Sequence, residues 1–204
     1  MKNLLLTSAG LTESMKKLFF DKLEKTPKDI KVLFVPAAAS YRDDAREGIA
    51  VTVYELQNMG IQLGNITAYN LDYVLSKGYP RTYSQYVKEV PPQYRLMTVE
   101  EVMAYDVIFV CGGYSEFLLK QINRTGFDEV MKEAINRGMF YIGVSAGSMV
   151  AAGNFATGLR VIENAVFAHS ESDAPRGEIL HDEAISLSNR QAILVSGERK
   201  MVIE

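Results

Sequence analysis

Short apolar segments alternate with helical patterns along most of the chain, and this alternation restricts the fold more than any other feature. Five segments rich in Leu, Ile, Val and Phe are bounded by turn residues, as is typical of strands buried on both faces of a sheet: 3–6, 31–35, 61–69, 106–110 and 139–144. The segments between them carry apolar residues at helical spacing: 11–23, 43–58, 99–105, 115–122 and 127–137. This order predicts an α/β fold, with a mostly parallel sheet wrapped by helices.

Two regions depart from this order. After Gly153, strand-like segments joined by tight turns predict hairpins at the end of the sheet: 160–168, 184–187, 192–195 and 200–203. Segment 77–97 has prolines and tyrosines among polar residues without a clear period, and is interpreted as an inserted loop. A chain of 204 residues can bury one substantial core, so we expect a single domain over residues 1–204.

Composition argues against several classes of partner. The net charge of −3 comes from interspersed acidic and basic residues, without the basic clusters that nucleic acids require. No window approaches the roughly 18 apolar residues of a membrane helix. The apolar run 1–7 is too short for a secretory signal, and the single cysteine, Cys111, fits a reducing compartment. We therefore expect a cytoplasmic protein with neither a nucleic-acid nor a membrane partner.

The sequence Gly-Val-Ser-Ala-Gly at residues 143–147 is the sharpest local signal. It matches a G-x-S-x-G nucleophile elbow, which needs a strand before it and a helix after it. Segment 139–142 supplies the strand, and the small residues of segment 148–152 supply a helix that can pack closely. Ser145 is therefore a candidate nucleophile, with the backbone N–H of Ala146 as an oxyanion donor. The alternative is a glycine-rich turn whose serine only caps the helix.

A second glycine turn follows the predicted strand 106–110. Gly112 and Gly113 allow the backbone to approach a ligand closely, and they can supply a second oxyanion N–H. Neighbouring parallel strands would bring both turns to one edge of the sheet, where ligands of such folds bind. A simple tight turn is the alternative. Cys111 is interpreted as a buried residue at the end of the strand.

A serine hydroxyl needs a base, and the chain has only two histidines. His169 follows a predicted strand and begins a polar loop, which suits an active site. His181 stands in a charged turn and is interpreted as exposed. We favour His169 over the alternative of a histidine that caps a strand end.

Several motifs together resemble the dipeptidase E (aspartyl dipeptidase) family of serine peptidases. They are Gly-Gly-Tyr at 112–114 before a helix with Phe-Leu-Leu at 117–119, the elbow string 141–147, Gly-Leu at 158–159 leading to His169, and segments 185–187 and 191–195. The resemblance implies a three-layer sandwich like that of class I glutamine amidotransferases (flavodoxin-like). It also implies Ser145 as nucleophile, His169 as base, Gly113 and Ala146 as oxyanion donors, and cleavage of dipeptides with an N-terminal aspartate. No metal or cofactor is implied.

The group that supports the histidine stays open in the sequence. Family members carry an acidic residue for this purpose, but the segment between Ser145 and His169 is shortened and offers only Glu163. Where some members place a glutamate, this chain has Asn189. Glu171 and Asp173 are further candidates.

The sequence also offers candidate residues for binding the substrate, and it leaves alternative functions open. Arg176 is the nearest basic residue after the histidine and is the candidate for binding an aspartyl carboxylate. The tyrosines of segment 77–97 are candidates for lining the pocket or for a homodimer contact. A noncatalytic ligand-binding homologue that has lost its supporting acid is the main alternative function. An amidotransferase-like enzyme is disfavoured, because that chemistry uses cysteine at the elbow.

Overall fold

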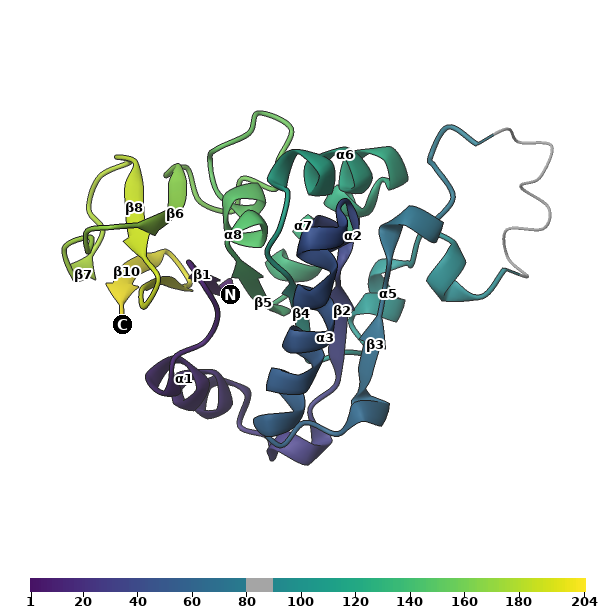
Figure 1. The fold of residues 1–204 in the computed structure, drawn as a ribbon, viewed down its shortest axis with the longest axis horizontal. Helices are drawn as coiled ribbons and strands as arrows, with labels where there is room; N and C mark the ends of the chain where they lie inside the picture. Colours follow the sequence, from purple (N-terminus) through teal and green to yellow (C-terminus); the bar gives the residue numbers. More distant parts are fainter. Residues whose placement is uncertain (80–89) are drawn as a thin grey trace.

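An eight-stranded sheet forms the centre of the computed structural model, which describes residues 1–79 and 90–204 (Figure 1). Its strands, in spatial order, are β3 (Ile66–Ala68), β2 (Val32–Val35), β4 (Val107–Val110), β5 (Phe140–Val144), β1 (Asn3–Thr7), β9 (Ala192–Ser196), β10 (Arg199–Ile203) and β7 (Gly177–Glu178). The pairs from β3 to β1 are parallel, and those from β1 to β7 are antiparallel. The predicted α/β fold with C-terminal hairpin strands is confirmed.

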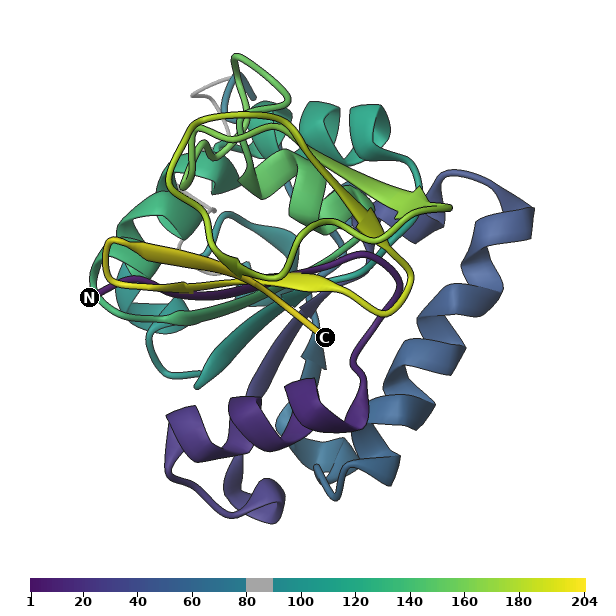
Figure 2. The ribbon, with the colours of Figure 1, turned by 90° about the vertical axis from the view of Figure 1, so that its left-hand side faces the viewer.

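Helices cover both faces of this sheet (Figure 2). On one face lie α1 (Glu13–Leu23) and α3 (Asp43–Asn58). On the other lie α5 (Val99–Val102), α6 (Ser115–Thr125), α7 (Phe127–Asn136) and α8 (Ala146–Ala151). The short α2 (Ala37–Ser40) follows β2, and 3₁₀ turns span η1 (Pro27–Asp29), η2 (Leu63–Asn65), η3 (Leu71–Tyr73) and η5 (Pro92–Tyr94). Right-handed crossovers explain this distribution. The chain passes from β1 to β2 and β3 toward one edge of the sheet and then returns to β4 and β5, so the helices of the two directions lie on opposite faces.

The core lies between the sheet and these helices. Residues 4–6, 32–35 and 107–110 are buried throughout, which explains their continuous apolar character. Phe19 of α1 packs edge-on against Phe140 of β5, with ring centroids 5.4 Å apart. Thr12 caps α1 by accepting a hydrogen bond from the N–H of Met15, so the helix begins two residues later than predicted.

Two strand predictions were too long. The predicted strand 61–69 is reduced to β3, because η2 occupies its first half. The predicted strand 160–168 begins later, as β6 (Val166–Ser170), because residues 161–164 form bends. Arg160 has φ +47°, and the buried Asn164 side chain donates to the carbonyl oxygens of His181 and Glu183. Side-chain hydrogen bonds to backbone 17 and 19 residues away thus replace a strand ladder there.

The pairing of β6 is also different from the prediction. β6 pairs in parallel with β8 (Ile185–Ser188) in a separate two-stranded sheet. A tight turn cannot join parallel strands, and the connection instead passes through β7 at the edge of the main sheet. The predicted hairpin between these two segments was therefore wrong, whereas β9 and β10 do form one.

The predicted inserted loop 77–97 lies partly outside the described residues, which omit 80–89. Its flanks contact the core. The N–H of Lys77 donates to the carbonyl of Arg124 at 2.9 Å. Arg95 binds the Glu101 carboxylate through two nitrogens, at 2.6 and 2.8 Å. Within residues 1–79 and 90–204, no helix combines the length and apolar character needed to cross a membrane.

Candidate active site

Ser145 occupies a sharp turn between β5 and α8. Its backbone has φ +47° and ψ −103°, a conformation that is strained for a residue with a side chain. The flanking glycines make the turn possible. A Cβ on Gly143 would lie 2.6 Å from the carbonyl carbon of Gly147, and a Cβ on Gly147 would lie 2.6 Å from the carbonyl oxygen of Val110. No larger residue fits at either position.

Buried hydrogen bonds hold this turn in place. The N–H of Ser145 donates to the carbonyl of Thr7, at the end of β1, over 2.9 Å. The Ser148 hydroxyl lies 2.7 Å from the carbonyl oxygens of Thr7 and Gly143. The Tyr141 hydroxyl donates to the carbonyl of Gly147 at 2.8 Å, and burial raises the pKa of this phenol. The strained backbone is therefore fixed from two neighbouring strands.

His169 lies next to Ser145. Its Nε2 atom is 3.0 Å from Ser145 Oγ, and its Nδ1 atom is 2.8 Å from Asn189 Oδ1. An amide oxygen can only accept a hydrogen bond, so this contact places the ring proton on Nδ1. Nε2 then has a free lone pair that faces the serine hydroxyl. This is the tautomer that a general base for serine requires.

Ser8 connects β1 to the segments that carry His169 and Asn189, a role that the sequence did not reveal. Its hydroxyl accepts a hydrogen bond from the N–H of His169 at 2.7 Å and donates to the carbonyl of Leu187 at 3.1 Å. Its N–H donates to the carbonyl of Gln191 at 3.1 Å, and the residue is fully buried. Thr7 thus binds the turn that carries Ser145, and the adjacent Ser8 binds the segments that carry His169 and Asn189. The only sequence feature that points to this role is that two polar residues, Thr7 and Ser8, stand at the end of an apolar strand.

The glycine turn after β4 lies beside the serine turn. A Cβ on Gly112 would lie 3.4 Å from the Cβ of Ser145. Gly113 has φ +136°, and a Cβ there would lie 2.2 Å from the carbonyl oxygen of Ala38. Among the described residues, none accepts a hydrogen bond from the N–H of Gly113 or of Ala146. Both N–H groups are therefore available to a ligand atom near Ser145.

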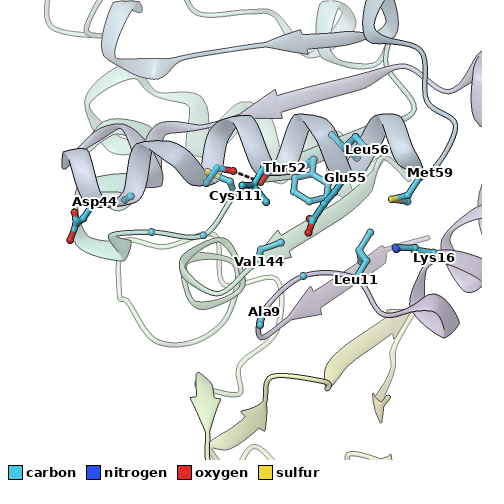
Figure 3. Close-up of a pocket in the computed structure, with 17 residues that line it drawn as sticks. Ala9, Leu11, Lys16, Asp44, Thr52, Glu55, Leu56, Met59, Cys111 and Val144 are labelled. Carbon is cyan, nitrogen blue, oxygen red and sulfur yellow. Dashed lines mark hydrogen bonds between the residues drawn. The ribbon is translucent and has the colours of Figure 1, made fainter.

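A cavity of about 330 Å³ opens beside these turns, between α3 and the loop after β1 (Figure 3). Gly112, Gly113 and Val144 line it, together with residues of α3. Cys111 also lines it, but only 2% of the residue is exposed. Burial raises the pKa of the Cys111 thiol to about 11. The thiol is therefore protonated and weakly nucleophilic at neutral pH.

Cys111 should resist alkylation in the folded protein. Iodoacetamide at pH 7.5 should leave the native chain almost unmodified, because the reagent needs an exposed thiolate. In denaturant the same treatment should add one group per chain, since the sequence has one cysteine. Intact-mass measurement distinguishes the two states. Complete alkylation of the native protein within minutes would contradict the described burial.

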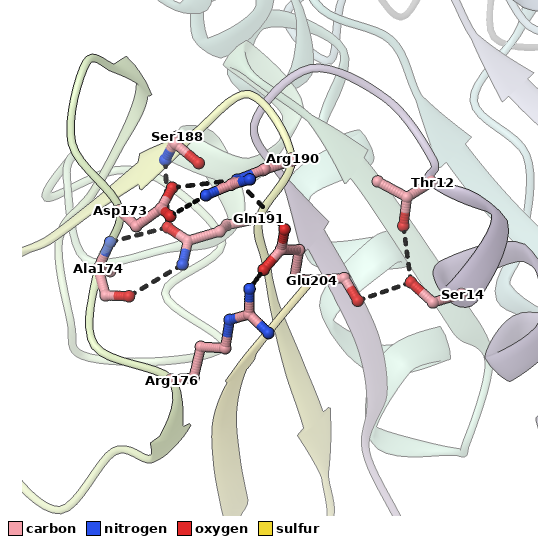
Figure 4. A network of polar contacts seen from close by, with 9 residues as sticks. All are labelled: Thr12, Ser14, Asp173, Ala174, Arg176, Ser188, Arg190, Gln191 and Glu204. Atoms are coloured by element: carbon pink, nitrogen blue, oxygen red, sulfur yellow. Dashed lines mark hydrogen bonds and ion pairs between the residues drawn. The ribbon is translucent and has the colours of Figure 1, made fainter.

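The three candidate carboxylates do not contact His169. Glu163 forms an ion pair with Arg160, three residues before it in the chain. Asp173 forms one with Arg190, which lowers the pKa of this carboxyl (Figure 4). Glu171 is exposed. Of the four residues that the sequence left open, the structure brings only Asn189 to the imidazole.

Arg176 and His181 lie elsewhere. The Arg176 guanidinium forms an ion pair with the side chain of Glu204, which also lies 3.2 Å from Arg190 (Figure 4). Arg176 makes no described contact with Ser145. His181 is exposed, as predicted. In residues 1–79 and 90–204, no three His, Cys, Asp or Glu side chains are grouped so as to hold a metal ion.

Comparison with known proteins relates part of this chain to peptidases. Residues 87–166 match the model of peptidase family S51. An uncharacterized peptidase of Listeria monocytogenes serovar 1/2a is 28% identical over 167 residues, which cover 76% of this chain and 63% of that protein. An uncharacterized peptidase of Pasteurella multocida is 43% identical over 49 residues, 24% of each chain. The matches thus span less than two thirds of the length of these relatives.

Two solved structures share the fold. One is a provisionally assigned peptidase E protein from Listeria monocytogenes EGD-e, with a TM-score of 0.66 and 21% identity, covering 100% of this chain and 98% of that one. The other is a peptidase from an acI-B1 actinobacterium, with a TM-score of 0.58 and 17% identity, covering 100% and 87%. At these identities the likeness concerns the fold alone.

Proposed function

We propose that this chain is a serine peptidase of family S51, the dipeptidase E family, and that it cleaves small peptides through Ser145 and His169. The observation that supports this most is the contact of 3.0 Å between Ser145 Oγ and His169 Nε2. A second is that the N–H groups of Gly113 and Ala146 have no acceptor among the described residues. Ala146 directly follows Ser145, and Gly113 follows Gly112, which lies against Ser145.

The proposed reaction passes through an acyl-enzyme. His169 Nε2 takes the hydroxyl proton while Ser145 Oγ attacks the carbonyl carbon of the peptide bond. The oxygen that becomes negative is bound by the N–H groups of Gly113 and Ala146. Each such donor raises kcat by roughly 10²- to 10³-fold. The imidazolium then protonates the leaving amine. A water molecule, deprotonated by His169, finally hydrolyses the ester.

Asn189 takes the place that an acid occupies in related sites. Its amide oxygen accepts the Nδ1 proton at 2.8 Å, which fixes the ring and the tautomer. A neutral amide stabilises the imidazolium less than a carboxylate would. A histidine supported by asparagine is nevertheless a working arrangement in papain-like cysteine proteases. We propose Asn189 as the residue that positions His169.

Substitution of Asn189 tests this assignment. Asn189→Ala should lower kcat by about 10- to 100-fold, because a hydrogen bond to a group that becomes charged is lost. Asn189→Asp should restore kcat relative to the alanine variant. It should also move the acidic limb of the pH profile to higher pH, since a carboxylate stabilises the imidazolium. An alanine variant with the kcat and pH profile of the parent protein would exclude the assignment.

Dipeptides are the proposed substrates, from the resemblance to the dipeptidase E family. The test is a panel of dipeptides that includes N-terminal Asp, Leu and Lys, with released amino acids measured by chromatography. The parent protein should release amino acids, and His169→Ala should release almost none. A folded protein that binds dipeptides without releasing amino acids would instead support the noncatalytic alternative.

A further inference from the structure

The cavity beside the oxyanion turn runs along one face of α3. Gly48, Thr52 and Leu56 line it at helical spacing, and Leu11 lines it from the loop after β1 (Figure 3). Val144, directly before Ser145, belongs to the same lining. We call this cavity the α3 groove.

We propose that the α3 groove binds an aliphatic side chain of the peptide substrate, carried by the residue whose carbonyl is attacked. This proposal rests on the proposed peptidase function. Gly113, the proposed oxyanion donor, lines the groove, and Gly112 lies against Ser145. A carbonyl oxygen bound to the N–H of Gly113 therefore brings the neighbouring side chain to the mouth of the groove.

The lining favours an aliphatic side chain over an acidic one. Leu11, Met59 and Val144 provide apolar surface, which gains from contact with another apolar group. Glu55 extends from α3 into the space near Val144 and Leu11, where its carboxylate would repel an aspartyl side chain (Figure 3). Lys16 cannot fully offset this charge, because its ammonium lies 2.7 Å from Glu13.

The basic residue that would favour aspartate is already engaged. Arg176 pairs with Glu204 and makes no described contact with Ser145. The α3 groove proposal therefore expects a substrate preference that differs from the aspartyl preference implied by the sequence resemblance.

Gly48 provides a sharp test, because it keeps the groove open. A Cβ at this position meets no atom within 4 Å. Glycine within a helix is unfavourable, so a larger side chain here should not destabilise the fold. Gly48→Leu should therefore fill the groove in a folded protein. Ala50→Leu, at an exposed position of the same helix, is the matched control.

The experiment compares kcat/KM for leucyl, aspartyl and lysyl p-nitroanilides and for p-nitrophenyl acetate, whose acyl group has no side chain. The parent protein should prefer the leucyl anilide at least tenfold over the other two anilides. Gly48→Leu should lower the ratio of leucyl anilide to acetate turnover at least tenfold, and Ala50→Leu should not change it.

The outcomes separate this proposal from the proposed function. If acetate turnover depends on Ser145 but Gly48→Leu leaves the ratio unchanged, the groove proposal is overturned and the peptidase proposal stands. A preference for the aspartyl or the lysyl anilide would also overturn the groove proposal. If no substrate is turned over in a Ser145-dependent way, both proposals fail.

Discussion

Replacing Ser145 by alanine should lower kcat for peptide hydrolysis by about 10⁴- to 10⁶-fold, the range seen when serine peptidases lose a member of the catalytic group. The loss should be chemical rather than structural. The hydroxyl contacts only His169 among the described residues. Alanine keeps the Cβ, so it keeps the same strained backbone. The melting temperature should therefore change by no more than a few degrees.

The neighbouring Ser148 is a matched control for this variant. Its hydroxyl is fully buried and binds the carbonyl oxygens of Thr7 and Gly143. Ser148→Ala should lower the free energy of unfolding by about 1–3 kcal/mol, because buried carbonyls lose a partner. The decrease in kcat should be far smaller for Ser148→Ala than for Ser145→Ala. Equal losses of kcat in the two variants would mean that the elbow has only a structural role.

The second large effect is expected at Gly113. Alanine at φ +136° is strained, and its Cβ would lie 2.2 Å from the carbonyl oxygen of Ala38. The turn must therefore move, which displaces the proposed oxyanion N–H. Gly113→Ala should lower kcat by about 10²- to 10³-fold. It should also lower the free energy of unfolding by roughly 3 kcal/mol.

Gly112→Ala is the control for this prediction. A Cβ on Gly112 meets Ser145 Cβ at 3.4 Å, an ordinary contact, and its φ is not in the left-handed region. The loss of kcat and the loss of unfolding free energy should both be smaller than in Gly113→Ala. Steady-state kinetics and chemical denaturation measure the two quantities. If both variants behave alike, the turn does not hold an N–H for the substrate.

Local patterns explain what the sequence could predict. The helix predicted over 43–58 is α3 to the residue, and the strands before both glycine turns lie where their apolar runs indicated. The structure explains the two glycines of the elbow motif, since neither position has space for a side chain. Each of these features depends on residues that are close in the chain.

Features that depend on distant contacts could not be predicted in the same way. Three acids near His169 in the sequence were plausible supports, but Glu163 pairs with Arg160 and Asp173 pairs with Arg190, 17 residues later in the chain. Asn189 reaches the imidazole because β6 pairs with β8 in parallel, a pairing that no short motif encodes. The role of Ser8 depends on the same tertiary arrangement, since its partners are more than 150 residues away.

The most direct measurement is covalent labelling with a fluorophosphonate, followed by intact-mass analysis and peptide mapping. A serine activated by His169 should form one adduct per chain, located on Ser145. The adduct should be absent in Ser145→Ala and form far more slowly in His169→Ala. A folded protein that forms no adduct, or one that is labelled at another residue while Ser145 stays free, would contradict the assignment of Ser145 as the nucleophile.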